Sequence, residues 1–426
     1  MDSQALLAVI IFLITYAVII TEKIHRTIVA IFGGIMLIML RVIDQETALH
    51  HIDFNTIGLL IGMMIIVSIT AQTGVFKYLA IKTAKIAKGD PLKILILLAL
   101  LTAFASAFLD NVTTVLLVIP VTLSITSKLK VNPMPFLLSQ IMASNIGGTA
   151  TMIGDPPNIM IGSAVPELSF LDFINNLAGI CIVILIVTIA IFALIFRKQL
   201  KTTNELKLEL MKSDEKSELT DSLLLTKCLF VITITICGFF VHQYIHIESA
   251  TIALFGAFLL LMITGEKHLE YSLERVEWTT LFFFIGLFVI VGGLVETGVI
   301  SSLAKSALHL TQGSLDKTTF LILWVSALAS AFVDNIPFVA TMIPLIHEMG
   351  SMGISNLEPL WWSLALGACL GGNGTLIGAS ANLVVAGLAA AEGHKITFAK
   401  YLMYGFPLMI LSIILSSIYI YLRYLI

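Results

Sequence analysis

The stretch SAFLDNVTT, residues 106–114, returns as SAFVDNIP at residues 330–337. The same offset of 224 positions relates the whole of residues 53–158 to residues 277–382 without a gap. Both copies are strongly hydrophobic, and both are interrupted in mid-span by polar, glycine and proline residues. Paired interrupted segments in the two halves of a membrane protein are the best sequence pointer to a transporter binding site. The duplication therefore predicts a transport site at these interruptions.

The composition indicates a polytopic helical membrane protein. The chain has 426 residues, of which 58% are hydrophobic and 12% are charged, whereas a soluble domain carries roughly 25% charged residues. Two soluble domains would fit the length, but this shortage of charge excludes them. Four cysteines lie in or beside apolar runs without the spacing of metal ligands, and we interpret them as small buried hydrophobic residues: Cys181, Cys228, Cys237 and Cys369.

A membrane-spanning helix needs about 20 apolar residues, and the chain supplies two sets of five such segments. The first set lies near residues 5–20, 26–43, 57–73, 134–166 and 173–196. The second set lies near residues 224–241, 250–264, 279–296, 358–390 and 402–422. The fourth segment of each set is broken by polar residues and is expected to be an unwound helix. Each set also contains a longer apolar stretch, residues 92–127 and 316–346, which is either two crossings or one re-entrant hairpin.

The odd number of crossings in each set predicts two inverted-topology repeats, residues 1–197 and 223–426, joined by a cytoplasmic linker at residues 198–222. With both termini outside the plasma membrane, 20 of the 24 lysine and arginine residues fall on the inside. This bias agrees with the positive-inside rule. Residues 76–93 carry lysines on one side of a helix, which we interpret as an interfacial helix on the inner leaflet.

Four polar interruptions carry the candidate site: two hairpin tips and two unwound spans. Lipid cannot satisfy loose backbone groups, so such breaks occur only where protein or a cavity surrounds them. Glycines permit close approach of another backbone, half-helix ends direct their dipoles at a ligand, and Thr, Asn and Ser supply neutral donors and acceptors. The candidate substrate- or ion-binding residues are Asp110, Asn111, Thr113, Thr114, Asn145, Gly148, Thr149, Asp155, Asn158, Asp334, Asn335, Gly372, Asn373, Thr375, Ser380 and Asn382.

The aspartates at the hairpin tips are candidates for a direct ion or proton role. Asp110 and Asp334 could each merely cap the helix that follows. An intramembrane carboxylate, however, costs about 2.5–3.5 kcal/mol, whereas Asn or Ser would cap almost as well. We therefore predict that Asp110 and Asp334, with the adjacent Asn111 and Asn335, bind a proton or Na⁺.

The buried charges of the proposed crossings are acidic, which favours cation coupling. They include Asp155, which is either an N-cap before Pro156 or a site residue whose counterpart in the second copy is Ala379. Arg26 is assigned to an inside loop. An anion carrier without a basic group would need helix dipoles, neutral donors or a bound Na⁺, whereas a cation or proton needs a carboxylate. The expected coupling ion is H⁺, Na⁺ or both, with no cofactor.

At these clusters the sequence resembles the ion-transporter superfamily that includes arsenite permeases, NhaD-type sodium–proton antiporters and sodium/dicarboxylate symporters, and within it the P-protein-like branch. The resemblance implies a homodimer in which a transport domain slides along a fixed scaffold, elevator-like, with the ligand sites at the hairpin tips and unwound spans. Dicarboxylate symporters usually carry Ser-Asn-Thr at the tips, so Asp-Asn favours the antiporter-like members. The similar stretches are EKIHRT at 22–27, SAFLDNVTT at 106–114, IGDPPN at 153–158, DNIPF at 334–338 and GGNGTLIGASAN at 371–382.

We therefore expect a secondary active transporter that exchanges H⁺ with a small cation such as Na⁺. Two alternatives are arsenite or antimonite efflux, and Na⁺-coupled transport of a dicarboxylate or inorganic anion. A channel-like conductance would share the inverted breaks. No Walker A sequence is present, so ATP hydrolysis would require a partner ATPase, and no zinc-enzyme motif or nucleic-acid-binding pattern is present. The expected partners are a small inorganic ion or small polar substrate and the lipid bilayer.

Overall fold

The computed structural model describes residues 2–21 and 23–426, which form helices and loops without a strand. Among these residues, eight helical segments are long and apolar enough to cross a membrane. This confirms the expectation of an all-α polytopic membrane protein. The eight segments are Ser3–Thr21, Phe54–Gln72, Asn111–Lys128, Phe170–Phe196, Ser222–Val241, Trp278–Glu296, Leu315–Phe332 and Phe398–Leu425.

One group of helices, called the frame below, is built on two close helix pairs, α2 with α16 and α4 with α14. A Cβ atom on Gly62 would lie 2.5 Å from the carbonyl carbon of Ala253, and one on Gly286 would lie 2.5 Å from that of Ala30. Small residues of this kind allow helix backbones to approach closely. Gly62 and Gly286 are counterparts in the duplication, so both copies pack by the same device. The frame consists of α1 (Ser3–Thr21), α2 (Arg26–Met39), α4 (Phe54–Gln72), α13 (Ser222–Val241), α14 (Ser249–Thr264) and α16 (Trp278–Glu296).

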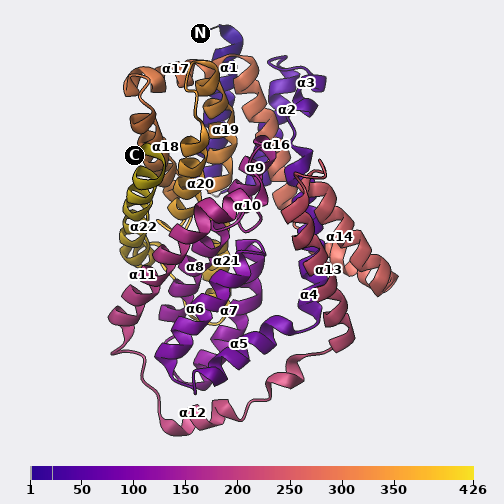
Figure 1. The fold of residues 1–426 in the computed structure, drawn as a ribbon, viewed down its shortest axis with the longest axis vertical. Coiled ribbons are helices and arrows are strands. Elements are labelled where there is room, and N and C mark those ends of the chain that lie inside the picture. The colour runs from indigo at the N-terminus through magenta and orange to yellow at the C-terminus, as the bar shows by residue number, and fades with distance from the viewer. Residues whose placement is uncertain (1, 22) are drawn as a thin grey trace.

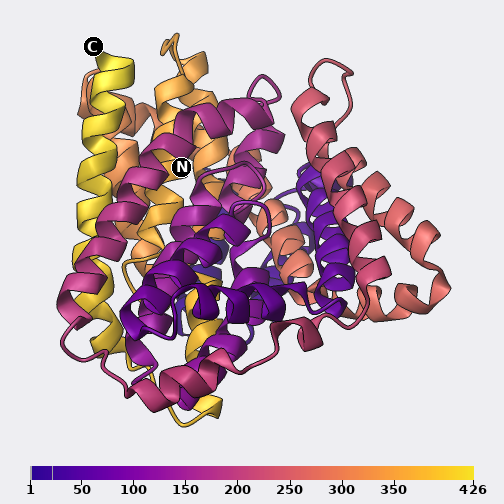
Figure 2. The ribbon, with the colours of Figure 1, turned by 60° about the horizontal axis from the view of Figure 1, so that its bottom comes forward.

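The second group, called the hairpin group, contains two helical hairpins and two broken helices. Figure 1 shows the α6–α7 hairpin in the lower half of the view and the α18–α19 hairpin in the upper half. In Figure 2, α22 lies on one side of the molecule, and α13 and α14 of the frame lie on the other. The group consists of α6 (Pro91–Ser106), α7 (Asn111–Lys128), α8 (Met134–Thr149), α9 (Pro156–Ala164), α11 (Gly179–Phe196), α18 (Leu315–Phe332), α19 (Asn335–Ser351), α20 (Glu358–Gly371), α21 (Ser380–Ala391) and α22 (Phe398–Ile420).

The two halves of the hairpin group are held by matching hydrogen bonds. Ser106, at the end of α6, donates from Oγ to the carbonyl oxygen of Ser144 at 2.7 Å. Its counterpart Ser330, near the end of α18, donates to the carbonyl oxygen of Ala368 at 2.6 Å. Each bond fastens a hairpin to the end of the broken helix beside it. The sequence duplication is therefore a duplication of local structure.

The remaining helices connect these groups. The expected helix within residues 76–93 is present as α5, but it ends at Ile86, before the start of α6. Its counterpart α17, at the same offset in the second copy, was not predicted, because its serines interrupt the apolar pattern. The connecting helices are α3 (Gln45–His50), α5 (Val75–Ile86), α10 (Phe170–Phe173), α12 (Asn204–Met211), α15 (Leu269–Arg275) and α17 (Val299–Thr311).

Two predicted spans are shorter in the structure than a membrane crossing requires. The segment expected at 26–43 is helical only over the 14 residues of α2, and the segment at 250–264 forms the 16-residue helix α14. At about 1.5 Å per residue, each is shorter than a hydrocarbon core of about 30 Å. The first residue of α2, Arg26, contacts the hairpin group, because it pairs with Asp334 at the start of α19.

Candidate functional site

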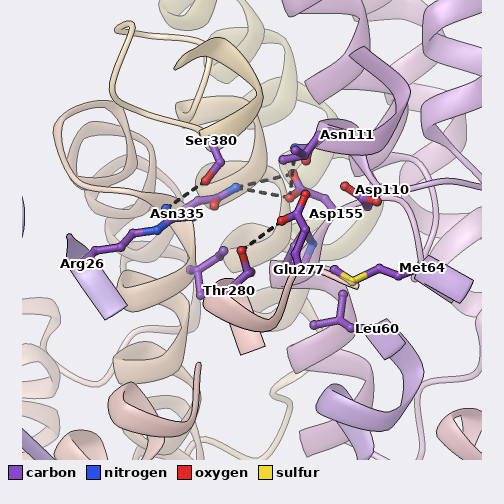
Figure 3. A pocket seen from close by; sticks show the side chains of 13 residues that line it. Arg26, Leu60, Met64, Asp110, Asn111, Asp155, Glu277, Thr280, Asn335 and Ser380 are labelled. Atoms are coloured by element: carbon purple, nitrogen blue, oxygen red, sulfur yellow. Dashed lines mark hydrogen bonds between the residues drawn. The ribbon is translucent and has the colours of Figure 1, made fainter. Parts of the chain in front are cut away.

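A buried carboxylate, Asp155, lies where the two hairpin tips meet. It immediately precedes α9 and is only 1% exposed. Asn111, the first residue of α7, donates from Nδ2 to Asp155 Oδ1 at 3.4 Å. Asn335, the first residue of α19, donates to the same oxygen at 3.4 Å. Figure 3 shows both amides converging on Asp155. Asn335 also donates to Asp155 Oδ2 at 3.5 Å. One carboxylate thus receives hydrogen bonds from each half of the chain.

A chain of asparagine amides extends inward from this carboxylate. Asn111 also donates to Asn145 Oδ1 at 3.1 Å. Asn145 in turn donates to Asn373 Oδ1 at 2.9 Å and to Asn382 Oδ1 at 3.0 Å. These residues are buried, and buried amides require such partners. The network therefore joins both unwound spans to the first hairpin tip.

A cavity of about 30 Å³ lies beside Asp155, between the hairpin group and the frame. This volume holds one or two water molecules. Asp110 and Glu277 also line the cavity, so three carboxylic acids face one small space. The lining residues are Arg26, Leu60, Met64, Asp110, Asn111, Val112, Asp155, Pro156, Glu277, Thr280, Asn335, Ile336 and Ser380.

The expectation that the charges around the site are all acidic is wrong, because Arg26 lines the cavity. Its guanidinium pairs with the carboxylate of Asp334, and its Nη1 donates to Ser380 Oγ at 2.9 Å. The guanidinium carbon lies 4.8 Å from the centre of the Phe283 ring, a cation–π geometry. Arg26 reaches the site because α2 begins beside the second hairpin tip. The sequence pattern within residues 26–43 does not predict this position.

Glu277 is a second cavity residue that the sequence analysis did not identify. It occupies the N-cap position of α16, and its Oε2 accepts a hydrogen bond from Thr280 Oγ1 at 3.0 Å. Its counterpart in the first copy is Asp53, the N-cap of α4, which accepts from Thr56 in the same way. Two acidic residues at equivalent helix starts are a signal in the sequence that could have identified this position.

The hairpin aspartates have different surroundings. Asp110 caps α7, accepting from the backbone nitrogen of Thr113 at 3.0 Å and from the Thr113 hydroxyl. Asp334 caps α19 through Ile336 N at 3.2 Å, but its carboxylate also pairs with Arg26. No group of three or more His, Cys, Asp or Glu side chains within residues 2–21 and 23–426 is arranged to hold a metal ion. The Na⁺ site at the paired Asp-Asn tips stays a prediction.

The other predicted residues build the site more than they line it. Asn158 donates to the carbonyl oxygens of Thr149 and Thr151, and its counterpart Asn382 donates to those of Gly372 and Thr375. Ser380 lines the cavity, whereas the Thr114 hydroxyl is buried without a partner among the described residues. The residues that shape the unwound spans are Gly148, Thr149, Asn158, Gly372, Thr375 and Asn382.

Several known proteins are similar to this chain in sequence. An uncharacterized transporter of Mycobacterium tuberculosis (strain ATCC 25618 / H37Rv) is 44% identical over 99% of each chain. A 46 kDa membrane protein of Mycobacterium leprae (strain TN) is 42% identical over 99% of this chain and 100% of its own. The P protein of Homo sapiens is 35% identical over 98% of this chain and 60% of its own length.

A solved structure shares the fold: the YdaH transporter of Alcanivorax borkumensis, with a TM-score of 0.59 and 14% identity, over 88% of this chain and 86% of that one. The family model described as citrate transporter (CitMHS) matches residues 16–367, well over half of the chain. The resemblance inferred from the polar clusters is thereby confirmed. The chain belongs to the CitMHS citrate transporter family of the ArsB/NhaD-type superfamily, and it is a membrane transporter.

Proposed function

We propose that the protein is a secondary active transporter that moves a small ion across the plasma membrane and exchanges it for H⁺ or Na⁺ at the central carboxylates. The observation that carries this proposal is the position of Asp155, which accepts hydrogen bonds from both hairpin tips. A proton or cation on Asp155 would compete with Asn111 and Asn335 for the same oxygen atoms. Occupation of the site would then change how the two hairpins are held together.

The cavity beside Asp155 suits a cation. Asp110, Asp155 and Glu277 surround it, and like charges in a low-dielectric space are stabilised by a bound cation or by a proton. Asp110 keeps the ion-binding role predicted from the sequence. Asp334 is less suited to that role, because Arg26 already neutralises its carboxylate. Two ions that compete for one group of carboxylates produce exchange.

The helix arrangement supports an elevator-type cycle of two inverted repeats. The two hairpins lie in opposite halves of the molecule (Figure 1), as expected if one enters from each side of the membrane. In this proposal the frame is the scaffold and the hairpin group is the transport domain. In this proposal the protein is a homodimer, because it resembles the superfamily. Both termini lie outside, because this orientation fits the distribution of lysine and arginine.

Na⁺-coupled transport of an organic anion is the second candidate function. Two observations favour it: Arg26 supplies a basic group at the cavity, and the matching family is described as citrate transporter. A substrate carboxylate would compete with Asp334 for the Arg26 guanidinium, whose planar fork suits carboxylates.

Purified protein in proteoliposomes that contain a pH-sensitive dye tests both candidates. The panel consists of Na⁺, Li⁺, K⁺, arsenite, sulfate, citrate and dicarboxylates. Cation exchange predicts proton movement on addition of Na⁺ or Li⁺ alone, and its loss in Asp155→Asn and Asp110→Asn. The control is Asp316→Asn, an exposed acid at the start of α18. Proton movement that requires citrate or another anion would favour the second candidate, and full activity of Asp155→Asn would refute the first.

A further inference from the structure

Arg26 belongs to the frame, but its polar side-chain partners belong to the hairpin group. Its guanidinium pairs with Asp334 at the tip of the second hairpin and donates to Ser380, the first residue of α21. The ring of Phe283, in α16 of the frame, supports it from one face. Arg26 therefore connects the two groups of helices across their boundary.

Arg26 and Ser380 also stand between two cavities. Both residues line the 30 Å³ cavity beside Asp155, and both line a neighbouring cavity of about 310 Å³, called the vestibule below, whose wall includes His25 and Phe332. The Arg26 and Asp334 side chains are 26% and 11% exposed. The hydrogen bond from Arg26 to Ser380 thus lies at the boundary between the vestibule and the enclosed carboxylate.

A second contact fastens the same hairpin to the frame. Tyr16, in α1, donates from its hydroxyl to the carbonyl oxygen of Pro337 in α19 at 2.8 Å. The first hairpin tip differs: the hydrogen bonds that Asp110 accepts, among the described residues, come from Thr113 of its own helix. Within residues 2–21 and 23–426, the frame therefore holds the second hairpin tip by polar contacts that are not found at the first.

We infer that Arg26 closes the path from the vestibule to the central carboxylates, and that its pair with Asp334 breaks in each transport cycle. The inference rests on the proposed alternating access, because only a hairpin that moves against the frame requires this pair to break. An arginine suits the task, since its Nη1 binds the Asp334 carboxylate and the Ser380 hydroxyl while the planar guanidinium lies over the Phe283 ring. A lysine would offer a single point charge instead.

The test measures access to the central cavity with a reporter thiol. Met64→Cys, on α4 of the frame, places a thiol at the cavity wall, and Cys237→Ser removes the exposed native cysteine. The full-length protein is purified, reconstituted in lipid nanodiscs and treated with a charged methanethiosulfonate. We expect Arg26→Gln and Asp334→Asn to raise the labelling rate roughly ten-fold by populating the open arrangement, and Arg26→Lys to give an intermediate rate.

Two further variants make the result specific. The charge-reversed double variant Arg26→Asp/Asp334→Arg should restore slow labelling, because the pair can form again. Arg41→Gln, at an exposed position beyond the end of α2, is the matched control and should leave the rate unchanged. Unchanged labelling in both Arg26→Gln and Asp334→Asn would overturn the inference, as would failure of the double variant to slow labelling.

The labelling assay needs neither substrate nor an ion gradient, so it separates the inference from the proposed function. Wild-type protein that moves no ion in proteoliposomes, but shows labelling controlled by Arg26, would refute the proposed exchange and retain the closed path. Ion-coupled transport together with a labelling rate that does not change in the Arg26 variants would refute the closed path and retain the proposed exchange. Melting temperatures of the variants exclude loss of fold as the cause of faster labelling.

Discussion

Asp155 owes its role to its neighbours and not to its own sequence context. Its local sequence, Asp before two prolines, is that of a helix cap, and its counterpart in the second copy is Ala379. The structure nevertheless gives it a hydrogen bond from each hairpin tip. A carboxylate without a counterpart in the second copy is therefore contacted by one residue from each copy, Asn111 and Asn335.

The two amide donors to Asp155 should contribute equally to transport. We expect Asn111→Ala and Asn335→Ala each to lower coupled flux about ten-fold, because a hydrogen bond to a charged group contributes ~1.5–3 kcal/mol. The measurement is the initial rate of dye-reported proton movement in proteoliposomes. Asn204→Ala in the linker is the control. Full flux in either hairpin variant would show that the contact with Asp155 is incidental.

Glu277 is expected to set the affinity for the coupling cation. Glu277→Gln removes one of the three acids around the cavity while keeping a hydrogen-bond acceptor for Thr280. We expect the half-saturating Na⁺ concentration to rise about ten-fold. A ten-fold change corresponds to about 1.4 kcal/mol, which is the size expected for the loss of one charge interaction. The concentration dependence of flux measures this, with the exposed Glu270→Gln as control. An unchanged half-saturating concentration would exclude Glu277 from the cation site.

At the scale of helices, close packing in the frame depends on glycine. A Cβ atom at Gly286 would lie 2.5 Å from backbone of α2, whereas one at Gly387, in α21, would meet no atom within 4 Å. We expect Gly286→Ala to destabilise the protein by about 1–3 kcal/mol through overpacking. Gly387→Ala should be neutral or stabilising by up to ~1 kcal/mol, since alanine favours helix. Thermal unfolding in detergent compares the two, and equal melting temperatures would contradict the packing argument.

The linker between the repeats is fastened to α5 by a contact that depends on pH. Lys85 donates from Nζ to Glu215 Oε2 at 2.5 Å, which lowers the pKa of the Glu215 carboxyl. A lowered pKa in the folded protein adds stability above the ordinary value of about 4.3, and this stability is lost as the pH falls through the lowered pKa.

Acidification below about pH 4.3 should therefore loosen the linker. We expect proteolytic cleavage near residues 212–222 to become faster in this range, measured with a protease active in acid such as pepsin. In Glu215→Gln the linker should be equally accessible at pH 6 and pH 3.5. A wild-type linker whose cleavage shows the same pH profile as that variant would exclude this contact as the cause.

At the scale of the whole molecule, α5 and α17 are counterparts that should face opposite compartments. The linker that contacts α5 is expected inside, and α17 outside. We expect a cysteine at Ser217 to react with an impermeant thiol reagent only in inside-out vesicles, and one at Ser302 only in right-side-out cells. Both positions are exposed. Cys237→Ser provides the background, and labelling of both positions from one side would refute the inverted repeat.

Local rules predicted the helices well, because hydrophobic runs, caps and breaks are properties of neighbouring residues. The breaks after α8 and α20 and the caps at Asp110 and Asp334 lie where the polar clusters indicated. The amphipathic helix α17 was missed because serines interrupt its apolar pattern. Its resemblance to α5 by the offset of 224 positions could have identified it.

The sequence by itself determined that the chain enters a membrane, that it contains one unit twice, and where each unit is broken. It also marked the hairpin tips as chemically special, since an acid in an apolar run is costly wherever the chain folds. Only the tertiary structure decided which charges meet. Arg26 and Asp334 form an ion pair although they are 308 positions apart in the sequence. Asp155 accepts a hydrogen bond from Asn335, which is 180 positions away. Such contacts depend on how whole helices pack against one another. No pattern within a single helix can report a contact between residues so far apart in the sequence.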